Sequence, residues 1–344
     1  MKKRTIFLAG DSTVQSYKTA DFPQCGWGAM LWKYFSEKDV VVTFPEDTAF
    51  ENVTRYELSD ITIDNRAMAG RSCRSFFDEG RWQDLLKNVR EGDFVLYQFA
   101  HNDANKEKEE RFIAPDSYKD KLIKDYINPV FEKKAHPVLL TAIAMKDFDE
   151  DGTCRISFPE YREKCLEIGR ELGVDVIDLG KRTADFNTKI GKEGCREIYM
   201  NLRPGMYCSF PDGKEDNAHL KAEGAFIYAG FVYEELKKLF EGSVFPYTLC
   251  GNPLTFTPVL NSKERIINRK NETDLKFNDI QVKLIAEIPA EIDIENNYIH
   301  YYNGSRDLSA EDITVKKLHK YFKHDTLDDQ FEGELEVFCQ KMTK

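Results

Sequence analysis

A serine follows the first apolar run of the chain, Ile6–Ala9, within the tripeptide Gly10-Asp11-Ser12. A short apolar run of this kind predicts a buried strand, and a glycine directly after it permits a sharp turn. Open α/β sheets bind their ligands at the carboxyl ends of the strands, which is where Ser12 would lie. A serine in that place is a candidate nucleophile, provided that a base lies next to it.

The candidate base comes from the other end of the same region. Asp216 precedes His219 by three residues, a spacing at which the carboxylate can curl back and hold the imidazole by its Nδ1 proton. An imidazole held in this way can take the proton of a serine hydroxyl, so Ser12, Asp216 and His219 predict nucleophilic acyl transfer. His101 is a second candidate base, but Asp103 is not obviously placed to orient it, and we expect a structural role for His101.

Two further polar positions follow strand-like runs. Gly70 comes after Ile61–Asn65, and Asn102 comes after Phe94–Phe99. Because parallel strands end at one edge of a sheet, both residues are expected near Ser12. The backbone N–H groups of Ser12 and Gly70 and the amide of Asn102 would then form an oxyanion hole. The simpler alternatives are a helix cap for Ser12, a conformational glycine and a turn asparagine.

Four residues are candidates for contact with the substrate: Asp11, Trp27, Arg71 and Arg74. Arg71 and Arg74 would bind the carboxylate of a uronate sugar, or else pair with acidic residues of the fold. Trp27 would line a sugar subsite, or else be a core aromatic residue at the start of a helix. Asp11 is included as the neighbour of Ser12.

Short apolar runs alternate with helical patterns over residues 1–245, which predicts a parallel sheet covered by helices on both faces. The expected strands are Ile6–Ala9, Ile61–Asn65, Phe94–Phe99, Val138–Ile143 and Val174–Leu179. The expected helices are Trp27–Glu37, Trp82–Arg90, Asp116–Lys134, 158–172 and 220–240. Pro129 should bend the third helix, Ser157 and Glu160 should cap the fourth, and Gly173 should end it.

The pattern changes beyond Pro246. Apolar residues at every second position from Ile280 to Ile288 predict a half-buried strand, and Tyr298–Tyr302 predicts a second one entering a turn at Asn303-Gly304. The last thirty or so residues look helical and charged. We therefore expect one domain over residues 1–245 and an extension of mixed α and β over 246–344, whose role the sequence does not define.

Net charge and cysteine usage indicate which classes of partner and which cellular compartment to expect. The net charge of the 344-residue chain is −11, which argues against a nucleic acid or an anionic membrane. Eight scattered cysteines without a Cys-x-x-Cys pair indicate reduced thiols in a cytoplasm. Met1-Lys2-Lys3-Arg4 imitates the start of a signal peptide, but the apolar run after it is shorter than the ~7–15 residues required. We expect no metal or cofactor, and the oligomeric state is left open.

Four groups of residues resemble one enzyme family. They are Gly10-Asp11-Ser12-Thr13-Val14, Gly26-Trp27-Gly28, Asn65-Arg66-Ala67 leading to Gly70-Arg71-Ser72, and Asp147-Phe148-Asp149. From about residue 5 to 240 the chain is similar to the SGNH (GDSL-type) hydrolases, and more narrowly to their rhamnogalacturonan acetylesterase group. The resemblance implies a flavodoxin-like three-layer α/β/α sandwich with a parallel sheet.

The same resemblance implies removal of acetyl groups from pectin-type sugars. It assigns Ser12 as the nucleophile, Asp216 and His219 as its partners, and Gly70 and Asn102 to the oxyanion hole. Two positions differ from the family pattern. Ala100 stands where Gly-His-Asn-Asp has its glycine, and Asn217-Ala218 interrupts Asp-Gly-x-His. If that glycine needs a positive φ, the loop that carries Asn102 must shift.

We therefore predict a metal-independent serine esterase that deacetylates an oligosaccharide through an acyl-enzyme. One alternative is an esterase or lipase that acts on another acyl ester, because a long acyl chain needs an apolar groove whereas an acetyl group needs only a small pocket. The other is an inactive carbohydrate-binding relative that has kept the scaffold.

Overall fold

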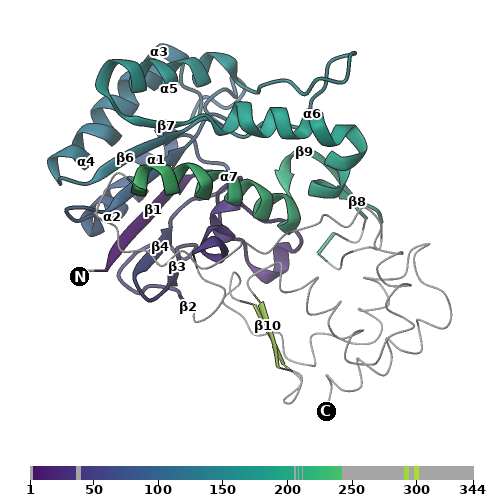
Figure 1. Cartoon of the computed structure of the whole chain (residues 1–344), viewed down its shortest axis with the longest axis horizontal. Helices are drawn as coiled ribbons and strands as arrows, with labels where there is room; N and C mark the ends of the chain where they lie inside the picture. Colours follow the sequence, from purple (N-terminus) through teal and green to yellow (C-terminus); the bar gives the residue numbers. More distant parts are fainter. Residues whose placement is uncertain are drawn as a thin grey trace.

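The structure is a computed structural model that describes residues 3–35, 40–204, 207, 209–210, 212–241, 290–293 and 298–301. Within them, a seven-stranded sheet has the order β2-β3-β4-β1-β5-β6-β7 (Figure 1). Its strands are β1 (Arg4–Gly10), β2 (Val41–Thr43), β3 (Thr54–Glu57), β4 (Ile61–Asn65), β5 (Phe94–Gln98), β6 (His136–Leu140) and β7 (Asp175–Ile177).

Five of these strands, from β4 to β7 in that order, are parallel, and β2 and β3 continue the sheet as antiparallel strands at one edge. Numbered among themselves, the parallel strands follow the order 2-1-3-4-5 of flavodoxin-like folds, in which ligands bind beside the first strand. The predicted α/β class and the five predicted strands are confirmed.

Helices cover both faces of the sheet. They are α1 (Cys73–Asp78), α2 (Arg81–Asn88), α3 (Pro115–Lys121), α4 (Asn128–Glu132), α5 (Pro159–Leu172), α6 (Leu179–Ile198) and α7 (Ala222–Glu241). Alternation along β1 separates two cores, because Ile6 and Leu8 pack beneath α6 and α7 whereas Phe7 and Ala9 pack beneath α1 to α5. These two cores on either side of one sheet are the predicted three layers.

Three predicted helices differ from the structure in detail. The segment after Gly26 forms two 3₁₀ turns, η2 (Trp27–Ala29) and η3 (Leu31–Tyr34), instead of one α-helix. The third predicted helix is α3 and α4 joined by a π-helical turn, η4 (Leu122–Ile127), which ends just before Pro129, where proline offers no N–H.

The fourth predicted helix ends at Gly173, whose φ of 67° provides the left-handed cap, as expected. The predicted capping box is wrong. Phe158, with a φ of 52°, precedes the first turn of α5 without a side-chain cap. The hydroxyl of Ser157 instead accepts a hydrogen bond from the backbone N–H of Met145, at 2.9 Å.

Two hairpins stand apart from the main sheet. β8 (Tyr199–Leu202) pairs with β9 (Lys214–Leu220), and β10 (Ala290–Asp293) pairs with β11 (Tyr298–Tyr301). The strand predicted from Tyr298 is thus confirmed. The strand predicted over 280–288, the turn at 303–304 and the charged helix at the end of the chain lie outside the described residues.

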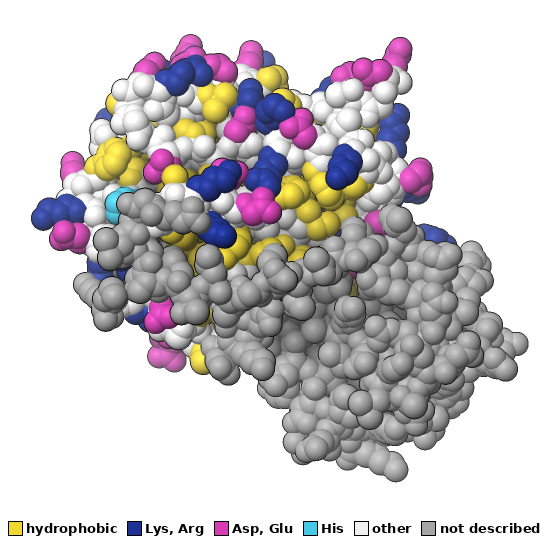
Figure 2. All heavy atoms as spheres, viewed as in Figure 1, with side chains coloured by type: hydrophobic (Ala, Val, Ile, Leu, Met, Phe, Trp, Pro, Cys, Tyr) yellow, Lys and Arg dark blue, Asp and Glu magenta, His cyan; other side chains and the backbone are white. Residues whose placement is uncertain are grey.

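The surface of the described part carries charges of both signs. Figure 2 shows basic and acidic side chains interspersed over the face in view. Exposed ion pairs of the described part include Lys181 with Asp185 and Arg170 with Glu163. No helix in the described ranges is both long and apolar enough to cross a bilayer.

Candidate active site

Ser12 lies in a tight turn directly after β1. The backbone N–H groups of Val14 and Gln15 both donate to the carbonyl of Asp11, each at 3.2 Å, so Ser12 is held at the tip of that turn. Its side chain is 8% exposed, and its Oγ lies 2.9 Å from Nε2 of His219. The hydroxyl predicted as nucleophile therefore contacts the predicted base, although 207 positions separate them in the sequence.

Asp216 orients His219 through a local turn. One carboxylate oxygen accepts the backbone N–H groups of Ala218 and His219, at 2.8 and 2.9 Å, and the other lies 2.7 Å from Nδ1 of the His219 ring. Burial alone would raise the pKa of Asp216, but the hydrogen bonds from the ring and backbone of His219 outweigh it and hold the pKa well below the usual range. The carboxylate is therefore ionised throughout the neutral range.

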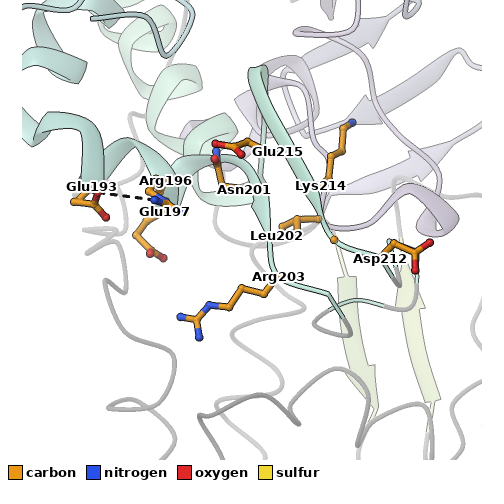
Figure 3. Close-up of a pocket in the computed structure, with 10 residues that line it drawn as sticks. Glu193, Arg196, Glu197, Asn201, Leu202, Arg203, Asp212, Lys214 and Glu215 are labelled. Carbon is orange, nitrogen blue, oxygen red and sulfur yellow. Dashed lines mark ion pairs between the residues drawn. The ribbon is translucent and has the colours of Figure 1, made fainter. Parts of the chain in front are cut away.

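β9, which carries Asp216 and His219, is an outlying strand with charged surroundings. Nζ of Lys214 lies 3.4 Å from Oδ2 of Asp216 and donates to Gln24 at 3.1 Å. The backbone carbonyl of Asn217 accepts from the N–H of Lys146 at 2.7 Å, which ties the hairpin to the segment after β6. A pocket of about 540 Å³ adjoins the hairpin, and residues of both signs line it (Figure 3).

Three hydrogen-bond donors are candidates for an oxyanion hole. Gly70, with a φ of 78°, lies between β4 and α1, in a conformation that favours glycine. Within the described residues, the backbone N–H groups of Ser12 and Gly70 have no acceptor. The amide nitrogen of Asn102 donates one of its two hydrogens to the carbonyl of Arg71, at 3.1 Å. Its second hydrogen is available to a ligand.

The loop after β5, residues 100–104, begins at Ala100, which stands where the family pattern has a glycine. Ala100 has a φ of 118°, a left-handed conformation that alanine adopts only at a cost. Asp103 holds the loop, because its carboxylate accepts the backbone N–H groups of Ala100 and Cys73, each at 2.9 Å. Burial raises the pKa of Asp103 to about 6. Ala100 therefore takes the positive φ that the glycine would favour, at the cost of local strain.

Two of the four predicted substrate contacts are buried. Asp11 is 0% exposed, and one of its oxygens accepts from the backbone and hydroxyl of Thr13. Trp27 is 1% exposed, and its ring N–H donates to the side chain of Gln98 at 2.8 Å. Neither side chain has surface to offer a substrate in this structure. For Trp27, the alternative prediction of a core aromatic residue describes its position.

The two predicted arginines are partly exposed and paired. Nε of Arg71 lies 2.9 Å from Glu79, and Nε of Arg74 lies 3.8 Å from Asp78. Arg74 also donates to the backbone carbonyls of Glu109 and Phe112. These contacts correspond to the alternative in which both arginines pair with acidic residues of the fold.

Sequence reasoning missed Arg111. Its guanidinium donates to Oδ1 of Asn102 at 3.5 Å and passes over Gly70. Arg111 ends a run of alternating charges that starts at Lys106 and is typical of a solvated surface, so no pattern marked it out. Lys214 was missed as well, although it stands only two positions before Asp216 on the same side of a strand.

The remaining candidate groups contribute less to the site. His101 has a buried Nε2 without a partner, and burial lowers the pKa of its ring. No hydrogen bond joins it to Ser12 in the described part of the chain. Among the same residues, no group of three histidines, cysteines or carboxylates is arranged to hold a metal ion.

Comparison with known proteins gives several relatives and no matching family model. The chain is 31% identical over 234 residues to rhamnogalacturonan acetylesterase RhgT of Bacillus subtilis, covering 68% of this chain and 90% of that protein. It is 32% identical to the probable rhamnogalacturonan acetylesterase YesY of the same organism, covering 68% and 93%. The crystal structure of Bacillus subtilis YxiM superposes with a TM-score of 0.55 at 26% identity, covering 71% of this chain and 58% of YxiM.

Proposed function

The chain belongs to the rhamnogalacturonan acetylesterase-like group of the SGNH (GDSL-type) hydrolases, which are carboxylic ester hydrolases, and on this premise we propose that it removes acetyl groups from a pectin-type oligosaccharide through an acyl-enzyme. The observation that carries the mechanism is the chain of contacts from Ser12 Oγ to His219 Nε2, 2.9 Å, and from His219 Nδ1 to Asp216, 2.7 Å. The names of the relatives support the class of substrate.

In the first half of the proposed reaction, Nε2 of His219 takes the hydroxyl proton while Oγ of Ser12 bonds to the acetyl carbonyl carbon. Asp216 holds the ring so that Nε2 is the basic nitrogen, and it stabilises the imidazolium. The carbonyl oxygen becomes an oxyanion, which accepts from the N–H groups of Ser12 and Gly70 and from Asn102. The tetrahedral intermediate collapses, the sugar hydroxyl leaves with the proton from His219, and the acetyl group stays on Ser12.

In the second half, water replaces the sugar. His219 removes a proton from the water, whose oxygen bonds to the acyl carbon, and the same donors hold the second oxyanion. Collapse breaks the bond to Ser12 Oγ, returns the proton to that oxygen and releases acetate. All the groups needed are side chains and backbone amides of this chain, so the cycle involves no cofactor.

Two accompanying proposals concern context. We propose a cytoplasmic location, supported by the five described cysteines, all of which are buried free thiols. We also retain the division into a hydrolase domain over residues 1–245 and an extension over 246–344 as a proposal. In this view, all the groups of the reaction lie in the first part.

The test compares the wild-type protein with Ser12→Ala and with a matched control, Ser59→Ala, which changes an exposed serine bonded only to Asp60 in the described structure. Each protein is given p-nitrophenyl acetate and acetylated rhamnogalacturonan oligosaccharides, and acetate release is measured. We expect Ser12→Ala to lose at least about a thousandfold in kcat and the control to match the wild type.

Three results would contradict the proposal. Equal activity of wild type and Ser12→Ala would exclude the serine mechanism. No activity in any of the proteins would favour the carbohydrate-binding alternative. A preference for esters with acyl chains of eight or more carbons would favour a lipase-like substrate. An acetylated xylan oligosaccharide included in parallel distinguishes pectin-type from other carbohydrate substrates.

A further inference from the structure

The guanidinium of Arg111 lies against two of the candidate oxyanion-hole residues, Asn102 and Gly70. Its Nη1 donates to Oδ1 of Asn102 at 3.5 Å. The same guanidinium lies over Gly70, so close that a Cβ at this position would stand 3.4 Å from Nη1. Its side chain is 34% exposed, and its Nε lies 3.5 Å from a carboxylate oxygen of Glu110.

The contacts of Asn102 distinguish the two ends of its amide. The oxygen end faces a guanidinium, which can only donate, and the nitrogen end faces the carbonyl of Arg71, which can only accept. Turning the amide over would put nitrogen against guanidinium and oxygen against carbonyl, and both hydrogen bonds would be lost. Arg111 and the Arg71 carbonyl therefore fix which end of the Asn102 amide carries the nitrogen, and only that end can donate to an oxyanion.

Arg111 is itself held in place. Its backbone N–H donates to the carbonyl of Lys108 at 2.9 Å, and the turn that it belongs to is joined to the loop after β5, because the N–H of Ile113 donates to the carbonyl of Asp103 at 3.1 Å. The hydroxyl of Tyr161 lies 2.7 Å from the carbonyl oxygen of Ile113 and 3.1 Å from that of Asp103, so its one proton is shared between the two acceptors. The segment that presents the guanidinium is thus fastened to the loop that presents Asn102.

We infer that Arg111 is a positioning residue for the oxyanion hole, which holds the amide of Asn102 in its donating orientation. The inference rests on the proposed function and deepens it. A donor aimed in advance stabilises the transition state more than the ground state, because it needs no reorganisation when charge appears on the oxygen. Removal of Arg111 should therefore lower kcat and leave KM nearly unchanged.

A double-mutant cycle tests whether Arg111 acts through Asn102 or independently of it. The variants are Arg111→Met, Arg111→Lys, Asn102→Ala and the double variant Arg111→Met/Asn102→Ala. They are assayed with p-nitrophenyl acetate, which is neutral and so excludes attraction of an anionic substrate. Arg90→Met removes the same charge from an exposed position and serves as the matched control. Thermal unfolding of each variant checks that it folds.

We expect Arg111→Met to lower kcat about tenfold to a hundredfold, since a hydrogen bond from a charged donor is lost, with KM within about twofold. Asn102→Ala should lose about 100–1,000-fold. The double variant should be no more than about threefold worse than Asn102→Ala, because Arg111 acts through the side chain already removed. Arg111→Lys should recover part of the loss, since an ammonium can still donate to Oδ1 of Asn102.

Losses that multiply in the double variant, or a change in KM alone, would overturn the inference and make Arg111 an independent substrate contact. An unchanged kcat in Arg111→Met would also overturn it. These outcomes are distinct from failure of the proposed function, in which Ser12→Ala would keep its activity. A loss in Asn102→Ala and Ser12→Ala without coupling to Arg111 would refute only the inference.

Discussion

The site has two sides that each contain an aspartate, and the two aspartates behave oppositely. Asp103 in the loop after β5 and Asp216 on β9 each accept two backbone N–H groups. Asp103 is fully buried, and burial raises its pKa to about 6. Asp216 is partly exposed and faces His219 and Lys214, and its pKa is lowered. The two carboxylates thus accept similar hydrogen bonds but have opposite pKa shifts. Burial determines the shift of Asp103, whereas the neighbouring donors determine the shift of Asp216.

The opposite pKa shifts fit a structural role for Asp103 and a chemical role for Asp216. The side with Asn102 is the loop directly after β5, which the buried hydrogen bonds of Asp103 fix, so in the proposed mechanism its donors are in place before a substrate arrives. The side with His219 is carried by a hairpin outside the sheet, next to a charged pocket (Figure 3). A buried carboxylate suits a fixed support, whereas a carboxylate that stays ionised suits the stabilisation of an imidazolium.

The largest expected effect separates the two aspartates by activity. Asp216→Asn should lower kcat by about 10³–10⁴, because an amide N–H facing Nδ1 favours the wrong tautomer of His219. Asp103→Asn should lower kcat by no more than about tenfold, because the new amide oxygen still accepts one of the two N–H groups. Steady-state kinetics with an acetyl ester provide the check. Equal losses of kcat in the two variants would contradict the distinction between a chemical Asp216 and a structural Asp103.

Stability should show the reverse order. Asp103→Asn leaves one buried N–H of Ala100 or Cys73 without an acceptor, at a cost of about 1–3 kcal/mol in the free energy of unfolding. Asp216→Asn keeps an oxygen for the turn at Ala218 and His219, so its loss should be smaller. Denaturant unfolding at neutral pH measures both. If Asp216→Asn were less stable than Asp103→Asn, Asp216 and not Asp103 would be the structural carboxylate.

The pH dependence of stability should differ in sign. The folded pKa of Asp103 is raised, so its contribution is fully present below the unfolded pKa of about 3.9 and is lost as pH rises through about 6. The deficit of Asp103→Asn should therefore shrink from pH 4 to 7. The folded pKa of Asp216 is lowered, so its contribution is present above about 3.9 and is lost as the pH falls further. The deficit of Asp216→Asn should shrink in acid, and parallel trends in the two variants would contradict this account.

The smallest effect concerns Ala100. Its φ of 118° is unfavourable for alanine, so Ala100→Gly should raise the free energy of unfolding by about 1 kcal/mol. Because Asp103 already fixes the loop, kcat should stay within about twofold. Thermal melting and kinetics of the one variant test both statements. A destabilised Ala100→Gly would mean that the loop carries no strain there.

The sequence predicted the parts of the fold whose signals are local. Each of the five parallel strands contains buried apolar residues, and Asp216 and His219 are joined by a turn within four positions, so pattern and spacing were sufficient. β2 and β3 were missed because both are short and only partly buried, so neither contains a long apolar run. β9 was missed because it is a polar segment, with exposed or half-exposed residues along most of its length.

Contacts between segments that are far apart in the sequence could not be predicted from it. Arg111 meets Gly70 and Asn102 only after three loops come together, and its sequence neighbours are ordinary surface charges. The burial of Asp11 and Trp27 likewise depends on how Gly26 and Gly28 let η2 approach the turn after β1. In these glycines a Cβ would lie 2.4 and 2.5 Å from backbone atoms of Val14. A single residue whose partner lies far away in the sequence belongs to no periodic pattern and has no fixed spacing to that partner, so the sequence does not reveal the contact.

The central claim, that Ser12 forms a covalent bond during the reaction, is tested most directly by trapping. The wild-type protein is treated with diethyl p-nitrophenyl phosphate, which phosphorylates an activated serine, and the modified peptide is identified by mass spectrometry. The account predicts one adduct per chain, on Ser12, formed in step with loss of esterase activity and absent from His219→Ala. An active protein that gains no adduct, or one that loses activity with the adduct on another residue, would contradict it.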